Sequence, residues 1–281
     1  MAKTLDNESK SPNEKRSKHD ALIAPPAAWF LGGFHRFLNR FLKRHFHAIA
    51  VLRDSRIDCG SLQDRPVIIY ANHPSWWDPL IAHFLNAALF SPRHFFAPID
   101  AEALQKYKVF EKLGFYGVQL STQSGAAAFL RNSLAILNRC DSALWITPEG
   151  RFADVRDHSA ELMPGLSHLC SKCSDVIAIP LALEYVFWDE RLPVCLVNLG
   201  QPLDAQQHRD WDKAAWGDAL RDGLRDAQAD LAAASIARSS DPFDNLLTGR
   251  RGAGGVYDAC RKLKAKLMGK PFDASHGDQF R

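Results

Sequence analysis

Short apolar runs that alternate with helix-like segments constrain the fold of this chain more than any other feature. The run at residues 66–71 (PVIIYA) has no charged residue and contains β-branched side chains, which is typical of a strand buried on both faces. The predicted strands lie at residues 66–71, 94–98, 115–120, 143–147, 176–187 and 195–199. The predicted helices lie at residues 78–90, 101–113, 125–138, 164–172 and 208–238. This order predicts an α/β fold, with a mostly parallel central sheet flanked by helices.

Polar residues follow the first predicted strand, and ligands of parallel sheets bind at such strand ends. Asn72 and His73 come directly after the strand, and Asp78 stands at the start of the next helix. An imidazole can accept a proton from a hydroxyl near neutral pH. If the turn folds back, the Asp78 carboxylate can accept a hydrogen bond from the His73 ring and fix its tautomer. The alternative role for Asp78 is to cap the helix N-terminus.

A second polar strand end contains Glu149, Gly150 and Arg151. Glycine at position 150 permits a backbone conformation that turns its two neighbours toward a shared ligand. A carboxylate suits a hydroxyl, and a guanidinium suits a phosphate or a carboxylate. Taken alone, this motif favours a surface turn with a local ion pair over a ligand site.

Composition divides the 281-residue chain into four predicted regions. Residues 1–20 are polar and of mixed charge, which is typical of a disordered tail. Residues 21–50 carry four basic side chains and no acidic one, although the net charge of the whole chain is only +3. Residues 51–204 are expected to form the α/β domain, and residues 205–281 a C-terminal helical region.

An amphipathic helix is predicted at residues 29–49. Its apolar face contains Phe30, Phe34, Phe37, Leu38, Phe41 and Leu42, and its other face contains Arg36, Arg40, Lys43 and Arg44. Such a helix can associate with a membrane by lying in its interface, or it can cover a protein core, and the pattern favours neither role. The apolar stretch at residues 21–34 is too short to cross a bilayer and contains Pro and Gly.

Cysteine usage and charge exclude several classes of protein. Six cysteines in a chain of this length do not form a disulfide framework, which favours a reducing compartment. Cys170 and Cys173 form an isolated C-x-x-C beside His168, so we expect core-facing helix residues there and no metal site. The near-balanced charge does not indicate a nucleic-acid partner. No apolar segment typical of a signal peptide occurs in residues 1–20.

Together these motifs resemble the glycerolipid acyltransferases, the 1-acylglycerol-3-phosphate acyltransferase type. Asn72-His73-x4-Asp78 is similar to the first signature block of that family, an HX4D motif, and residues 148–151 (PEGR) are similar to the third. Residues 176–180 (VIAIP) are similar to the fourth block, a hydrophobic strand that ends in Pro. The order and separation of the blocks agree with the family over residues 52–202.

The resemblance implies an O-acyltransferase that moves a fatty acyl group from acyl-coenzyme A (acyl-CoA) or acyl carrier protein to a hydroxyl of a lipid acceptor, in phospholipid synthesis. His73 would be the general base, and Asp78 would orient it. The implied substrate-binding residues are Asn72, Glu149, Gly150 and Arg151. No metal and no cofactor beyond the thioester co-substrate are implied. The expected partners are membrane lipids and the acyl donor, with a peripheral location on the cytoplasmic face of a membrane. Residues 21–50 would then form an amphipathic basic helix that associates with this membrane.

Two positions depart from the resembled family. Its second block usually ends in Arg, whereas residues 114–120 end here in Leu120. Its third block usually reads Glu-Gly-x-Arg, whereas Arg151 follows Gly150 directly. Both departures favour an acceptor other than glycerol 3-phosphate, such as a bulkier lysophospholipid or related lipid alcohol.

Two other functions compete with this interpretation. A metal-dependent phosphohydrolase would need several His, Asp or Glu ligands at compatible spacing, and no second cluster is evident near a strand end. A non-catalytic peripheral membrane-binding module would use the basic helix but would leave His73, Asp78 and Glu149 without a role.

Overall fold

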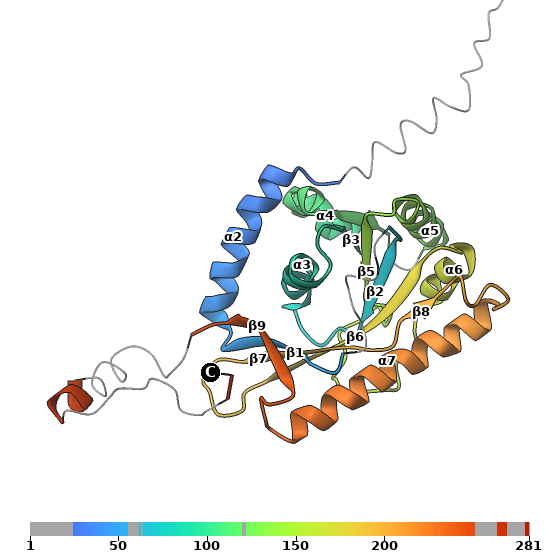
Figure 1. Cartoon of the computed structure of the whole chain (residues 1–281). Coiled ribbons are helices and arrows are strands. Elements are labelled where there is room, and N and C mark those ends of the chain that lie inside the picture. The colour runs from blue at the N-terminus through green and yellow to red at the C-terminus, as the bar shows by residue number, and fades with distance from the viewer. Residues whose placement is uncertain are drawn as a thin grey trace, which may run out of the picture.

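A mixed β-sheet lies between two layers of helices in the computed structural model, which describes residues 25–55, 62, 64–119, 122–250, 263–268 and 279–280 (Figure 1). The strands are β1 (Ala48–Leu52), β2 (Val67–Ala71), β3 (His94–Asp100), β4 (Phe115–Val118), β5 (Ser142–Ile146), β6 (Ile177–Val186), β7 (Val194–Leu199), β8 (Leu203–Asp204) and β9 (Phe243–Thr248). The helices are α2 (Ala28–His45), α3 (Asp78–Leu89), α4 (Ala101–Lys106), the 3-10 helix η3 (Lys108–Leu113), α5 (Gln123–Leu137), α6 (Gly165–Lys172) and α7 (Lys213–Ile236).

The strand order places the parallel strands together at one side of the sheet. The order is β4-β3-β5-β2-β6-β7-β1-β9, and β8 pairs with β6. The first five strands in this order run parallel to one another. β7 is antiparallel to β6, β1 is parallel to β7, and β9 is antiparallel to β1. The predicted α/β class with a mostly parallel, helix-flanked sheet is therefore confirmed.

The all-apolar sequence of β2 is explained by burial on both faces of the sheet. Because successive side chains of a strand point to opposite faces, Val67 and Ile69 pack in the core formed with α2 and α3. Ile68 and Tyr70 pack in a second core, formed with α5, α6 and α7. β2 is thus fixed at the centre of the molecule, and its C-terminal end is a rigid place from which a functional loop can start.

The structure differs from the predicted elements on both sides of the predicted α/β domain. The helix predicted at residues 29–49 ends at His45, because Ala48–Leu52 forms strand β1 between β7 and β9. The predicted border at residue 50 therefore falls inside a strand. The region predicted as C-terminal helices contains β9 as well as α7, and α7 packs along β6. The predicted tail at residues 1–20 and Leu120 lie outside the described residues.

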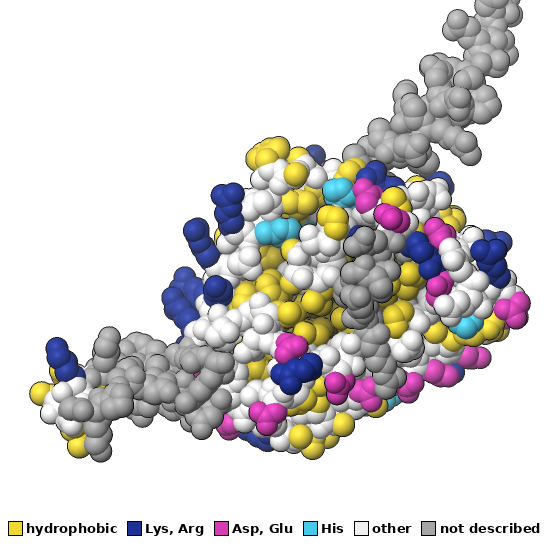
Figure 2. Space-filling view, viewed as in Figure 1, with side chains coloured by type: hydrophobic (Ala, Val, Ile, Leu, Met, Phe, Trp, Pro, Cys, Tyr) yellow, Lys and Arg dark blue, Asp and Glu magenta, His cyan; other side chains and the backbone are white. Residues whose placement is uncertain are grey.

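Helix α2 covers the core on one side and exposes its cations on the other. Leu38 and Leu42 are buried against α3 and the sheet, whereas Trp29 and Phe37 are exposed. The exposed basic residues of the helix are Arg36, Arg40, Lys43 and Arg44. Figure 2 shows dark blue side chains along the outer side of α2. In the part of the chain that is described, no helix combines the length and apolarity that crossing a bilayer requires.

The helix predicted at residues 101–113 is divided in two. Tyr107 leaves the helical region of backbone conformation (φ −127°, ψ 72°), so α4 ends before it and η3 follows. Gly114 then adopts a left-handed conformation (φ 92°), which turns the chain into β4. These elements lie at the edge of the sheet where the cavity described below is found.

Candidate active site

The loop between β2 and α3 brings His73 and Asp78 together. His73 Nδ1 lies 2.6 Å from Asp78 Oδ2. Because a carboxylate can only accept, Nδ1 carries the proton and the second ring nitrogen, Nε2, is left as a proton acceptor. Asp78 is 4% exposed, and it is the first residue of α3. Its carboxylate therefore stands at the helix N-terminus and orients the imidazole at the same time.

Two further donors hold the Asp78 carboxylate. The backbone N–H of Ser75 donates to Oδ2 over 3.1 Å, and the Tyr185 hydroxyl donates to Oδ1 over 2.6 Å. Burial, with Cys195 and Asp78 close by, raises the pKa of Tyr185 well above 10, so this hydroxyl keeps its proton. Tyr185 was not predicted, because it lies 107 positions beyond Asp78 on β6 and is brought to the site by strand pairing.

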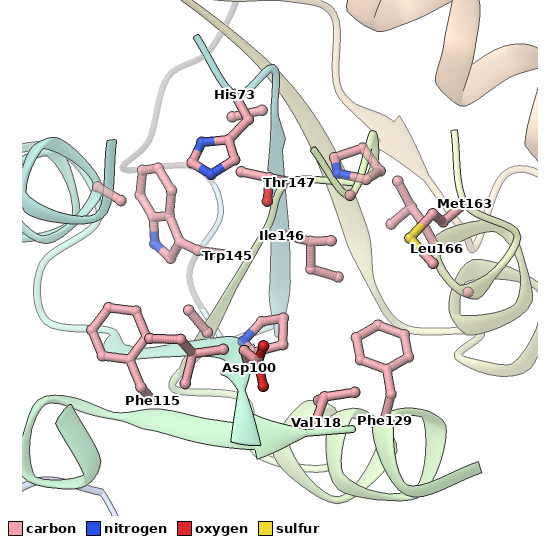
Figure 3. A pocket seen from close by; sticks show the side chains of 18 of the residues that line it. His73, Asp100, Phe115, Val118, Phe129, Trp145, Ile146, Thr147, Met163 and Leu166 are labelled. Atoms are coloured by element: carbon pink, nitrogen blue, oxygen red, sulfur yellow. The ribbon is translucent and has the colours of Figure 1, made fainter. Parts of the chain in front are cut away.

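A cavity of about 580 Å³ opens next to His73. The pairing of β3 with β5 ends at Phe96 and Leu144, and β3 continues to Asp100 beside β4. The cavity lies where the two strands diverge, and most of its wall is apolar. Its apolar lining includes Ala82, Phe95, Ile99, Phe115, Val118, Phe129, Leu130, Trp145, Ile146, Met163 and Leu166. Figure 3 shows His73 at one end of the cavity, with a ring nitrogen directed into it, and Phe115, Val118 and Phe129 at the other.

Asn72 joins two strands with both ends of its side-chain amide. Its Nδ2 donates to the Leu183 carbonyl over 3.0 Å, and its Oδ1 accepts from the Leu183 N–H over 2.8 Å. The pair of hydrogen bonds extends the contact of β2 with β6 beyond the end of β2. The amide borders the cavity, but its hydrogen bonds fix the loop that carries His73. This geometry favours positioning over the substrate binding that the sequence led us to expect.

The three residues of the second polar strand end point in different directions. Gly150 borders the cavity with a left-handed backbone (φ 64°). The Glu149 side chain is buried, and its Oε1 accepts from Arg225 Nη1 of α7 over 2.9 Å. Arg151 is half-exposed and donates to Asp157 Oδ2 over 2.9 Å. Neither Glu149 nor Arg151 is part of the cavity wall. Arg225 was not predicted, because it lies on α7, 76 positions beyond Glu149 in the chain.

Phe152 stacks on the catalytic candidate, His73. The two ring centroids lie 4.2 Å apart, with an angle of 29° between the ring planes. The N–H of Ala153 donates to the His73 carbonyl over 3.1 Å and holds the two segments together. Position 152 is where the resembled Glu-Gly-x-Arg block would carry its Arg. The stacking was not predicted, because an aromatic residue in a polar loop carries no signal for its partner.

Among the described residues, no group of three or more His, Cys, Asp or Glu side chains is arranged to hold a metal ion. Cys170 is buried within α6, whereas Cys173 caps the C-terminus of this helix and is partly buried. Burial raises the pKa of the Cys173 thiol to about 11. Both belong to the core or its border, as the sequence predicted.

Comparison with known proteins assigns part of the chain to a family. No curated protein matches the chain. A protein-family model described as acyltransferase matches residues 41–184, just over half of the chain. The matched segment includes His73, Asp78, Glu149 and Phe152, whereas Tyr185 and Arg225 lie beyond it. The resemblance drawn from the signature blocks is thereby confirmed: the chain belongs to the glycerolipid acyltransferase family.

Proposed function

We propose that the protein transfers a fatty acyl group from an acyl thioester to a hydroxyl of a lipid acceptor. The observation that carries the proposal is the His73–Asp78 pair at one end of an apolar cavity. Membership of the acyltransferase family supports acyl transfer to lipids in general. The geometry supplies a base for the acceptor and an apolar space for a chain.

The reaction follows from the protonation state of His73. Nδ1 is held by Asp78, so Nε2 accepts the proton of the acceptor hydroxyl as its oxygen attacks the thioester carbonyl carbon. The buried Asp78 carboxylate stabilises the imidazolium that forms. When the tetrahedral intermediate collapses, the carbon–sulfur bond breaks and the imidazolium returns its proton to the leaving thiolate. His73 is then neutral again, and the products are an ester and a thiol.

The cavity supports the proposal for the donor. A cavity of about 580 Å³ lined by aromatic and aliphatic side chains suits an acyl chain, since burial of methylene groups is favourable by about 0.8 kcal/mol each. The chain would extend from His73 toward Phe115 and Phe129, with the thioester carbonyl beside the imidazole. We propose acyl-CoA or acyl carrier protein as the donor.

The position of the charges supports a bulky acceptor. Arg151 pairs with Asp157 outside the cavity wall, so it is not placed to hold an acceptor phosphate beside His73. We therefore propose a lysophospholipid or a related lipid alcohol, and a role in phospholipid synthesis.

A membrane location for the enzyme follows from such substrates. Exposed aromatic side chains, Trp29 and Phe37, and four exposed cations on α2 support docking to anionic lipids. We propose a peripheral position on the cytoplasmic face of a membrane.

The decisive experiment compares two histidine variants with palmitoyl-CoA as donor and a panel of lysolipids. His73→Ala should lower kcat by about 10²–10⁴-fold, the usual contribution of a general base. The matched control is His94→Ala, because His94 also pairs with an aspartate, with its Nε2 3.6 Å from Asp141 Oδ2, but lies at the opposite end of strands β3 and β5 from the cavity. Full activity of His73→Ala would refute the proposed mechanism. If the wild-type protein binds vesicles but transfers no acyl group, the result would instead support a membrane-binding module.

A further inference from the structure

Phe152 is a large aromatic residue placed in the open, directly over the imidazole. The residue is 59% exposed, although burial of a Phe side chain lowers the free energy of a folded protein. In the described structure, its ring contact is with His73. The turn at Gly150 and the Ala153–His73 hydrogen bond hold it there, so its place is set by the backbone.

The stacking leaves one approach to the base. Phe152 covers a face of the imidazole, and Asp78 occupies Nδ1, so the acceptor hydroxyl reaches Nε2 near the plane of the ring. The atoms that carry this hydroxyl then pass the exposed part of the Phe152 ring. An aromatic ring offers apolar contact there and no hydrogen-bond donor.

The positions of the charged side chains near His73 support the same apolar approach for the acceptor. Neither Arg151 nor Arg225 is part of the cavity wall, since each is engaged by a carboxylate elsewhere. Lys213, at the start of α7, is the one Lys or Arg among the described lining residues, and it belongs to the wall formed with α6. A phosphate on the carbon next to the reacting hydroxyl would meet the phenyl ring of Phe152 and no guanidinium of the Glu149–Arg151 turn.

We propose that Phe152 determines acceptor specificity: its ring packs on the acceptor next to the reacting hydroxyl and favours an uncharged substituent there over a phosphate. This inference rests on the proposed acyl transfer and deepens it: among the proposed acceptors, it favours a lipid alcohol without a phosphate next to the reacting hydroxyl over a lysophospholipid that carries one there. The ring also fixes the plane of the His73 imidazole, so that Nε2 is presented to the acceptor at a constant angle.

The test uses two acceptors that differ only in a phosphate, 1-oleoylglycerol and 1-oleoylglycerol 3-phosphate, with palmitoyl-CoA as donor. Phe152→Leu should lower kcat/KM for 1-oleoylglycerol by about tenfold, mainly through KM, because a hydrophobic contact is lost. Phe152→Arg should raise the preference for the phosphate-bearing acceptor by about tenfold or more, because a guanidinium forms charge-assisted hydrogen bonds with phosphate. The control is Phe187→Leu, since Phe187 is 64% exposed, as Phe152 is 59% exposed, but among the described ring contacts it has none with His73.

Each result has a defined meaning. If neither Phe152 variant changes the ratio of the two kcat/KM values more than Phe187→Leu does, the inference is wrong. In that case the proposed function still holds if His73→Ala is inactive in the same assay. If the wild-type protein acylates no acceptor, the proposed function fails, and the inference fails with it. Equal thermal unfolding of the three variants shows that the ratio reports on recognition and not on folding.

Discussion

Removal of the Tyr185 hydroxyl should slow catalysis, although this hydroxyl does not contact a substrate. In the structure this hydroxyl, on a partly buried ring, donates to Oδ1 of the buried Asp78 carboxylate over 2.6 Å. Tyr185→Phe keeps the ring and deletes the donor. A hydrogen bond to a charged group contributes about 1.5–3 kcal/mol, and Tyr185→Phe removes the hydrogen bond that Asp78 Oδ1 accepts from the hydroxyl. If this energy holds Asp78 in the orientation that serves His73, kcat falls about 10- to 100-fold.

The assay separates positioning from general stability. We expect Tyr185→Phe to lower kcat with little change in KM, because the acceptor does not meet this hydroxyl. Tyr116→Phe is the matched control, since the buried Tyr116 hydroxyl bonds to Ser133 Oγ over 2.8 Å, away from the cavity wall. It should cost about 0.5–1.5 kcal/mol of stability and leave kcat unchanged.

A double variant tests whether Tyr185 acts through Asp78. Once Asp78→Asn has removed the carboxylate, adding Tyr185→Phe should reduce kcat little further, because groups that act as a unit are not additive. Two results would refute the reasoning: wild-type kcat for Tyr185→Phe, or a double variant whose loss equals the product of the single losses.

Three further predictions concern stability and the turn beside the cavity. Arg225→Met should lower the free energy of unfolding by about 3–5 kcal/mol, measured in urea, because Glu149 would remain buried without its cation; Glu149→Gln in the same chain should restore part of it. Burial lowers the pKa of His83 from 6.5 to about 3, so the folded protein holds it neutral. The contribution of neutral His83 to the free energy of unfolding is complete above pH 6.5. It is lost as pH falls toward 3, by about 1.4 kcal/mol per pH unit. His83→Leu should therefore show a correspondingly smaller loss of stability between pH 6.5 and 5. Gly150→Ala should destabilise by about 1–2 kcal/mol in thermal unfolding, because φ is 64° and the added Cβ would lie 2.6 Å from Met163 Sδ; unchanged melting would show that the turn adapts.

The parts of the site that the sequence predicts are local. His73 and Asp78 are five positions apart, between a buried strand and a helix, and such a loop can return on itself only in a few ways. The strand and helix positions around it follow from periodicity, which depends on neighbouring residues alone. The error at the end of α2 has the same origin. The apolar run Ala48–Leu52 continues the helical spacing, and what makes it a strand is pairing with β7 and β9, 142 and more residues away in the chain.

The parts that the sequence does not predict depend on how distant strands are aligned. Tyr185 reaches Asp78 because β6 is five residues longer than the stretch that pairs with β2, so its end passes over the loop after Ala71. The cavity exists because β3 leaves β5 after Phe96 and pairs with β4, which is a choice of partner and not a property of either segment. Arg151 was the evident anion-binding residue in the sequence, yet the turn at Gly150 directs it to Asp157. The same turn places Phe152 over His73. One residue of displacement in a turn thus exchanges a cation for an aromatic ring at the base, and the preference of the enzyme for its acceptor should follow that exchange.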